Sequence, residues 1–188
     1  MNLLVDVKNI IPEIVFDIRY ATANNFTGNP VYLSDGCFLH ADALECLKKA
    51  HIYAKKLGYN FKLFDAFRPH EAQEILWEHT PDENFLANPA RGSAHSRGVA
   101  VDLTLIDKAG KELDMGTEFD EFSPLSYHTE IAGISGEALR NRALLLGIMS
   151  ASGFDFYKNE WWHYQLFNAK NYPLIKDTEA KTGLIFKL

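Results

Sequence analysis

The sequence predicts an α+β fold, a single domain with a mostly antiparallel central sheet and flanking helices. Four segments have the residue pattern of short strands, and three longer ones repeat apolar residues at helical spacing. Strands and helices alternate only loosely along the chain, and some links between strands are short. Short links favour antiparallel pairing, because a parallel pair needs a long crossover.

The first half of the chain is expected to contribute two strands and two helices. In order, these are a strand at 14–20, a loop at 24–36, a helix at 41–57, a strand at 61–65 and a helix from Arg68-Pro69 to about Thr80. The loop is rich in Asn, Gly, Pro, Ser and Asp. Gly58 suits the C-terminal end of the first helix. Pro69 suits the first helical position of the second, where its missing N–H costs nothing.

The second half is expected to contribute a strand at 99–105, a helix at 135–152 and a strand at 161–167. The first of these strands places four large apolar residues on one face and Asp102 on the other. Ser135 has the residue type of a helix N-cap. In the last strand, His163 lies on the less apolar face, opposite Trp162.

Length and charge restrict the class of protein. The 188 residues fit one domain over 1–188, without a repeat or linker. A net charge of −6 without a basic cluster excludes nucleic acid as a partner, and no apolar run is long enough to span a membrane. The first residues, Met1–Asp6, lack a signal-peptide pattern, so a cytoplasmic location is expected, although a trimmed leader would leave the same pattern. Cys37 and Cys46 are expected to be free thiols.

Four residues in two short stretches carry the strongest chemical signal: His95, Asp102, Glu160 and His163. Two imidazoles and one carboxylate form a three-ligand zinc set, which leaves a fourth position open for water. The additional glutamate supplies a base for that water. A structural zinc site needs neither an open coordination position nor an additional base. The sequence therefore predicts one Zn²⁺ per chain and a hydrolytic reaction.

The predicted elements are compatible with one shared site. Burying an unpaired Asp102 in mid-strand would cost several kcal/mol, a cost that a metal removes. Gly98 allows the chain to turn between His95 and Asp102. Residues three apart in a strand point to opposite faces. Glu160 must therefore lie just outside the regular strand if it is to share a cleft with His163.

Each signal is weak when taken alone. A His-x6-Asp or Glu-x-x-His pair arises often by chance, and Trp161-Trp162 is most often core packing. Arg68 by itself would be interpreted as a surface salt-bridge residue, and Asp120 equally well as an exposed acid. His128, near Asp120 in sequence, is a lesser candidate for lining the cleft. The combination of motifs carries the metal interpretation.

That combination resembles the D-alanyl-D-alanine dipeptidase family, within the wider group of zinc D,D-peptidases. The matching segments are Ser93-x-His95-x-x-Gly98-x-Ala100-x-Asp102, Glu160-Trp161-Trp162-His163, Asp17–Thr22, Asn25–Gly28, Phe67–Pro69 and Met115–Asp120. The likeness runs from about residue 12 to about residue 167. The metal motif is shared with related carboxypeptidases and endopeptidases, whereas the segments around Tyr20 and Asp120 are more particular to the dipeptidases.

The resemblance implies a role for each matched residue. It implies His95, Asp102 and His163 as zinc ligands, Glu160 as the general base and Arg68 as the group that stabilises the oxyanion. It also implies that Asp120, with Tyr20 and Ser93, surrounds the free amino end of the substrate. These eight residues are the expected site. The expected substrate is the free dipeptide D-alanyl-D-alanine, hydrolysed to two D-alanine.

Three alternatives remain open at this point. A zinc D,D-carboxypeptidase or peptidoglycan endopeptidase would share the metal motif. A non-catalytic zinc-binding domain would need neither Glu160 nor Arg68. A dipeptidase for L-amino acids would have the same residue spacing. Glycopeptide resistance and use of the dipeptide as a nutrient both suit the main prediction, and no surface stripe indicates an oligomeric state.

Overall fold

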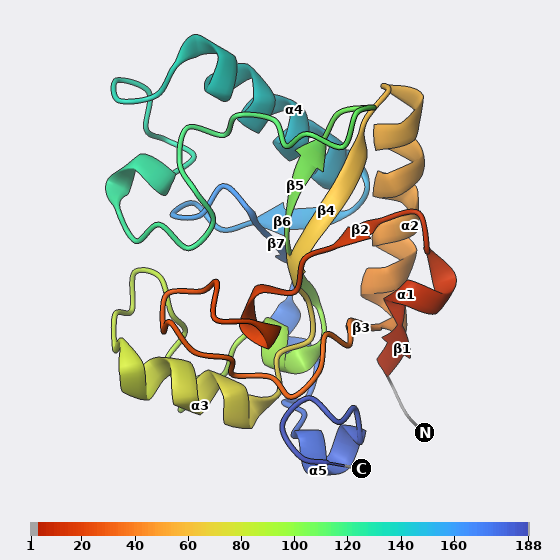
Figure 1. Cartoon of the computed structure of the whole chain (residues 1–188), viewed down its shortest axis with the longest axis vertical. Helices are drawn as coiled ribbons and strands as arrows, with labels where there is room; N and C mark the ends of the chain where they lie inside the picture. The colour runs from red at the N-terminus through yellow and green to blue at the C-terminus, as the bar shows by residue number, and fades with distance from the viewer. Residues whose placement is uncertain (1–3, 188) are drawn as a thin grey trace.

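A five-stranded sheet forms the centre of the computed structural model, which describes residues 4–187 (Figure 1). Its strands, in spatial order, are β2 (Val15–Phe16), β4 (Asn60–Asp65), β5 (Ala100–Ile106), β7 (His163–Leu166) and β6 (Phe154–Phe156). A smaller two-stranded sheet pairs β1 (Leu4–Asp6) with β3 (Phe38–His40). The segment Met1–Asp6, which lacks a signal-peptide pattern, lies partly outside the described residues, because these begin at residue 4.

The large sheet is mixed, with most pairs antiparallel. β4 with β5, β5 with β7, and β7 with β6 are antiparallel, whereas β2 pairs with β4 in parallel. The predicted α+β class and mostly antiparallel sheet are therefore confirmed, with one parallel pair at the edge. All seven residues of β5 are buried, so this central strand is covered on both faces.

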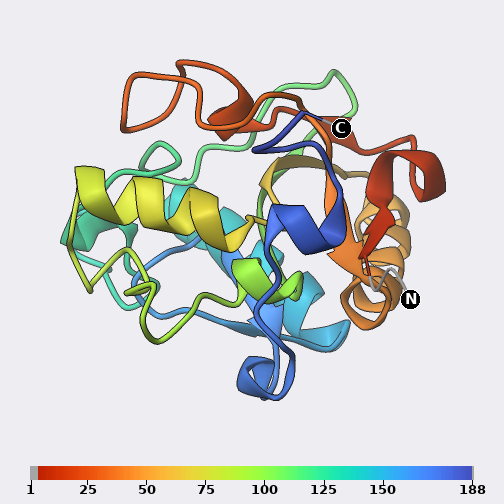
Figure 2. The same ribbon diagram turned by 90° about the horizontal axis from the view of Figure 1, so that it is seen from below.

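Five helices surround the sheets: α1 (Val7–Ile10), α2 (Ala41–Lys56), α3 (His70–His79), α4 (Gly136–Ala151) and α5 (Asp177–Ala180). α2 packs against β4 and α4, and α4 packs against β6. In both views α3 lies away from α2, with the strands of the large sheet between them (Figures 1 and 2). Among residues 4–187, no helix combines the length and apolarity needed to cross a bilayer.

The caps explain where the two long helices begin. The Ser135 hydroxyl accepts the Ala138 amide at the start of α4, as the sequence predicted. At the start of α2, the Nδ1 atom of His40 accepts the Asp42 amide at 3.2 Å. Pro69 was predicted to occupy the first helical position of α3, and this prediction is wrong by one residue. It is the N-cap of α3, and the helix begins at the following residue.

The predicted strand at 14–20 is wrong over most of its length. Only Val15–Phe16 pair with β4, and a 3-10 turn then forms at Arg19–Ala21. The turn is held because the Tyr20 carbonyl accepts the amides of both Val31 and Tyr32 at 2.8 Å. Residues 161–162 likewise form a turn before β7. The three-residue strands β1, β3 and β6 are too short to give a periodic pattern and were not predicted.

Both cysteines are free thiols, as predicted, with Cys37 buried and Cys46 half-buried. Burial raises the pKa of the Cys37 thiol far above its usual range. A thiol held in its neutral form is a poor nucleophile and a poor metal ligand. The structure thus assigns the cysteines to packing.

The C-terminal segment is fastened by one buried carboxylate, that of Asp177. Its two oxygens accept the amide and hydroxyl of Thr182 and the amides of Ile185 and Phe186. Burial alone would raise the pKa of Asp177, but these donors outweigh it and hold the pKa below its usual value. The ionised form therefore stabilises the fold.

We expect Asp177→Ala to lower the free energy of unfolding by about 1–3 kcal/mol, because three partly buried backbone amides lose their acceptor. The pKa is lowered on folding, so this contribution is present above the unfolded value of about 3.9 and is lost as the pH falls below it. Urea unfolding at pH 7 and pH 3 measures both effects. The exposed neighbour Glu179→Ala is the control, and an equal loss at both pH values would contradict the assignment.

Candidate active site

The register of the large sheet places three polar residues in one row across three strands. Asp65 on β4 lies opposite Asp102 on β5, which lies opposite His163 on β7. Residues directly opposite each other in an antiparallel pair project from the same face. A register shift between Leu63 and Asp65 brings the β4 residue into this row. The sheet therefore gathers three polar groups whose positions span almost 100 residues of sequence.

His95 reaches the same place from the loop before β5. It begins a 3-10 turn, His95–Arg97, which ends at Gly98 in the left-handed conformation with φ of 69°. A Cβ atom at Gly98 would lie 2.5 Å from the Leu4 side chain and 3.2 Å from the His40 amide nitrogen. Only glycine fits this turn. Gly98 was predicted to allow the chain to turn between His95 and Asp102, and these close contacts explain why a larger residue could not do so.

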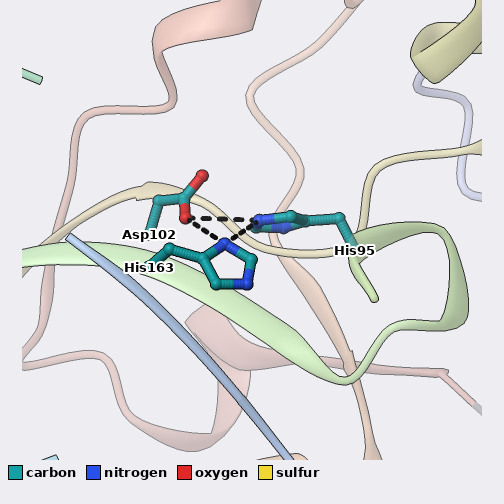
Figure 3. A group of neighbouring side chains, drawn as sticks. All are labelled: His95, Asp102 and His163. Atoms are coloured by element: carbon teal, nitrogen blue, oxygen red, sulfur yellow. Dashed lines mark hydrogen bonds and ion pairs between the residues drawn. The ribbon is translucent and has the colours of Figure 1, made fainter. Parts of the chain in front are cut away.

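Three candidate ligand atoms meet at one point (Figure 3). The His95 Nε2 lies 3.1 Å from the His163 Nδ1 and 3.2 Å from the Asp102 Oδ1, and the His163 and Asp102 atoms are 3.1 Å apart. All three residues are buried. The neighbouring imidazoles hold the pKa of Asp102 below its usual value, although burial alone would raise it.

The donor chemistry of this triangle fits a zinc ion. Tetrahedral coordination with bonds of about 2.1 Å separates ligand atoms by about 3.4 Å, close to the spacing seen here. His95 donates its Nδ1–H to the Ala66 carbonyl at 2.7 Å, and the His163 Nε2 pairs with the Gln165 Oε1 at 3.1 Å. Each bond leaves the other ring nitrogen with a lone pair directed into the triangle, the usual arrangement of metal-bound histidines.

Glu160 lies beside this triangle, in the turn that precedes β7. Its carbonyl accepts the His163 amide at 3.4 Å, and its Oε2 lies 3.8 Å from the His163 Nδ1. The regular strand begins at His163, so the expectation that Glu160 stands outside it is confirmed. Burial raises the pKa of Glu160 well above its usual value, and the charges of Asp102 and Asp120 add to the shift.

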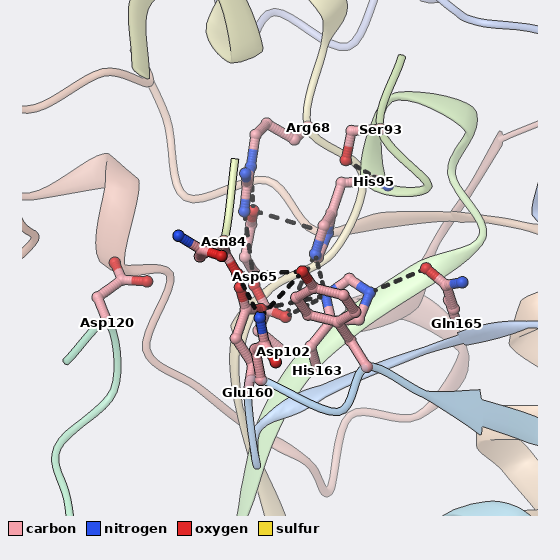
Figure 4. A network of polar contacts seen from close by, with 12 residues as sticks. Asp65, Arg68, Asn84, Ser93, His95, Asp102, Asp120, Glu160, His163 and Gln165 are labelled. Carbon is pink, nitrogen blue, oxygen red and sulfur yellow. Dashed lines mark hydrogen bonds and ion pairs between the residues drawn. The ribbon is translucent and has the colours of Figure 1, made fainter. Parts of the chain in front are cut away.

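Arg68 is buried and contacts four residues, of which Figure 4 labels Asp65 and Asp102. Its Nε donates to the Asp65 Oδ2 at 2.8 Å and its Nη1 to the Gln73 Oε1 at 3.0 Å. The Nη2 lies 3.5 Å from the Asp102 Oδ2, and the guanidinium carbon is 4.9 Å from the centre of the Tyr20 ring. Its interpretation as a surface salt-bridge residue is therefore wrong.

Asp120 lines the same cavity from a different segment. It adopts a left-handed backbone conformation, with φ of 60°, and accepts the Tyr20 hydroxyl at 3.0 Å. Burial raises the pKa of Asp120 to about 8, with a further contribution from the charge of Asp102. The carboxyl is half-buried, and a cation bound beside it would stabilise its ionised form. Its interpretation as an exposed acid does not hold.

The cavity encloses about 280 Å³ and is lined by all eight residues of the expected site. Figure 4 shows Asp120 on one side of the His95–Asp102–His163 triangle, and Ser93 and Gln165 on the other. The Ser93 hydroxyl accepts the His95 amide at 3.1 Å and keeps its own proton to donate. Part of the wall is formed by Glu83, Phe85, Leu86 and Ala87. His128 is not among the lining residues and instead packs against Phe156 and Tyr164.

Sequence reasoning missed the residues that hold the expected site residues in place. Asp65 binds Arg68 with one oxygen and accepts the Tyr32 hydroxyl at 2.9 Å with the other. Gln73 holds the Arg68 guanidinium, and Gln165 fixes the ring of His163. One signal was available: Asp65 ends an apolar strand three residues before Arg68. The glutamines carry no motif.

Comparison with known proteins decides the family. The family model Peptidase_M15, described as D-ala-D-ala dipeptidase, matches residues 1–180. The chain belongs to this family. The resemblance found in the sequence is thereby confirmed, and the protein is a metallopeptidase.

Relatives of this dipeptidase family cover nearly the whole chain. The D-alanyl-D-alanine dipeptidase of Escherichia coli is 42% identical over 174 residues, covering 93% of this chain and 90% of its own. That of Enterococcus faecalis is 37% identical over 192 residues, covering 89% and 92%. The solved LD-carboxypeptidase LdcB is 18% identical with a TM-score of 0.51, and the alignment covers 91% of this chain and 71% of that one. This last likeness shows a shared fold.

Proposed function

We propose that this chain, acting as one domain over residues 1–188, is a zinc-dependent dipeptidase that hydrolyses D-alanyl-D-alanine to two D-alanine. The main support is the convergence of three lone pairs, from His95, Asp102 and His163, beside a buried glutamate and a buried arginine. A binding domain would need neither of those two groups. The substrate is taken from the relatives, which are named D-alanyl-D-alanine dipeptidases.

A zinc ion held by these three residues would lower the pKa of a water molecule to about 7 and polarise the substrate carbonyl. Glu160 accepts a proton from water as the oxygen attacks the carbonyl carbon. It then returns that proton to the departing nitrogen as the C–N bond breaks. The raised pKa of Glu160 suits a group that must take up a proton and hold it between these two steps.

Arg68 stabilises the negative charge that develops on the carbonyl oxygen. Its guanidinium is already fixed by Asp65 and Gln73, so little reorganisation is needed during the reaction. Asp120 pairs with the free ammonium of the dipeptide, next to the Tyr20 hydroxyl. Ser93 was expected beside the amino end, but it lies across the ligand triangle from Asp120 and would instead contact the other end of the substrate. A longer peptide without a free amine would not form this ion pair, so it would bind less tightly than the free dipeptide.

Release of D-alanine from D-Ala-D-Ala tests the proposed function. L-Ala-L-Ala and N-acetyl-D-Ala-D-Ala are the matched substrates, each with and without a chelator. We expect chelator-sensitive cleavage of the free D,D-dipeptide alone. Cleavage of the acetylated substrate would favour the carboxypeptidase alternative. Zinc binding without cleavage of any substrate would favour a binding domain.

Asp120→Asn is expected to raise KM for D-Ala-D-Ala on the order of 10²-fold, with zinc content unchanged. Losing one partner of a buried charge pair costs about 2–5 kcal/mol, and each 1.4 kcal/mol is a factor of ten. Steady-state kinetics with metal analysis measures this. Glu118→Gln, in the same acidic segment, is the control. An unchanged KM would remove Asp120 from the substrate site.

A further inference from the structure

The cavity has two cationic residues, Arg97 and Lys170, that the proposed mechanism does not use. Most other ionisable groups that line it have a partner of opposite charge: Arg68 pairs with Asp65, and Glu83 with Arg91. Among residues 4–187, neither Arg97 nor Lys170 lies within ion-pair distance of a carboxylate. Arg97 is half-buried and Lys170 is exposed, so both charges are free to bind an anion that enters the cavity.

One contact joins the segments that carry these two cations. The Arg97 Nη1 donates to the carbonyl of Tyr172, two residues beyond Lys170. The Arg97 Nη2 lies 3.0 Å from the point where a side chain on Gly92 would begin. Gly92 has φ of 77° and precedes Ser93 directly. The Arg97 guanidinium therefore lies between Gly92, the neighbour of Ser93, and Tyr172, and Lys170 lines the cavity two residues before Tyr172.

The end of the cavity that contains Ser93 lies away from Asp120, the residue proposed to bind the substrate's ammonium group. Ser93 and Asp120 lie on opposite sides of the catalytic centre, with Arg68, Glu160 and His163 between them (Figure 4). The cavity thus has a carboxylate at one end and two cations at the other. A free dipeptide is a zwitterion with the same separation of charge: its ammonium precedes the scissile bond and its carboxylate follows that bond by one residue, about 3.8 Å of chain.

We propose that Arg97 and Lys170 form the site for the substrate's terminal carboxylate. This inference rests on the proposed function. Guanidinium and ammonium groups bind carboxylates through charge-assisted hydrogen bonds, and uncompensated cations attract an anion into a cavity. Arg97 lies two residues from His95 in the same 3-10 turn, so the carboxylate site is built onto the segment that carries a metal ligand. The enzyme would therefore require a free carboxylate as well as a free amine.

The experiment compares D-Ala-D-Ala with D-alanyl-D-alaninamide, which has the same scissile bond and no carboxylate. The wild-type holoenzyme is compared with Arg97→Met, Lys170→Met and the double variant, and zinc content and Tm are measured for each. We expect the wild type to prefer the acid by about 10²-fold in kcat/KM. Each variant should lose about tenfold of this preference through KM, with turnover of the amide unchanged. Arg140→Met, an exposed charge on α4, is the control.

Arg97 also holds the Tyr172 carbonyl, so its loss could disturb the fold as well as the charge. Lys170→Met leaves that hydrogen bond in place and separates the two effects. Equal loss with both substrates, or a wild type indifferent to the carboxylate, would overturn the inference while leaving the dipeptidase function standing. A wild type that cleaves neither substrate would overturn the proposed function itself.

Discussion

Glu160→Gln is expected to reduce kcat for D-Ala-D-Ala by about 10²–10⁴-fold while zinc remains bound, the range typical of a lost general acid–base group. Glutamine has the size of the native side chain but accepts no proton. Glu160 is buried beside the three ligands without being one of them, so the metal site should survive. The loss should therefore fall on kcat, with KM and metal content close to wild type.

Steady-state kinetics together with zinc analysis of the purified variant gives the answer. Glu137→Gln, an exposed glutamate in the first turn of α4, controls for a simple loss of charge. Activity within tenfold of wild type would remove Glu160 as the base. Loss of zinc in the variant would instead make it a ligand.

Removal of the metal is expected to abolish activity and to lower Tm. Without an ion, the Asp102 carboxylate and the two imidazoles stay buried with their lone pairs directed at one another. A ligand at 1,000 times its Kd stabilises the native state by about 4 kcal/mol, which the chelated protein forgoes. Calorimetry with and without EDTA, followed by addition of zinc, measures the loss and its recovery.

Two histidine variants make the metal test specific. His163→Ala should bind zinc with less than one ion per chain and should not recover activity when zinc is added. His79→Ala, an exposed histidine at the end of α3, should keep full stoichiometry. An EDTA-treated wild type that remains fully active would refute the zinc mechanism.

The sequence could predict the candidate site residues themselves better than the residues that hold them in place. His95, Asp102, Glu160 and His163 lie in short motifs whose spacing reflects local structure, a turn closed by Gly98 and a turn entering β7. The long helices at 41–56 and 136–151 have enough turns for their periodicity to show. In both cases the determining contacts are local.

What the sequence could not predict depends on contacts between distant segments. The row formed by Asp65, Asp102 and His163 exists only because β4, β5 and β7 pair in one particular register. The turn that replaces the predicted strand at 14–20 depends on two amides from residues 31–32. Neither interaction leaves a pattern in its own segment, so periodicity alone could not find it.

The order of the ligands along the chain has a consequence for synthesis in the cell. Because His163 lies on β7 and the other two proposed ligands lie on or before β5, a growing polypeptide carries two ligands well before the third leaves the ribosome. The proposed base, Glu160, is made only three residues before His163. A nascent chain that ends before β7 would therefore lack both the third ligand and the base. The proposed activity would begin only after β7 has been made and has joined β5.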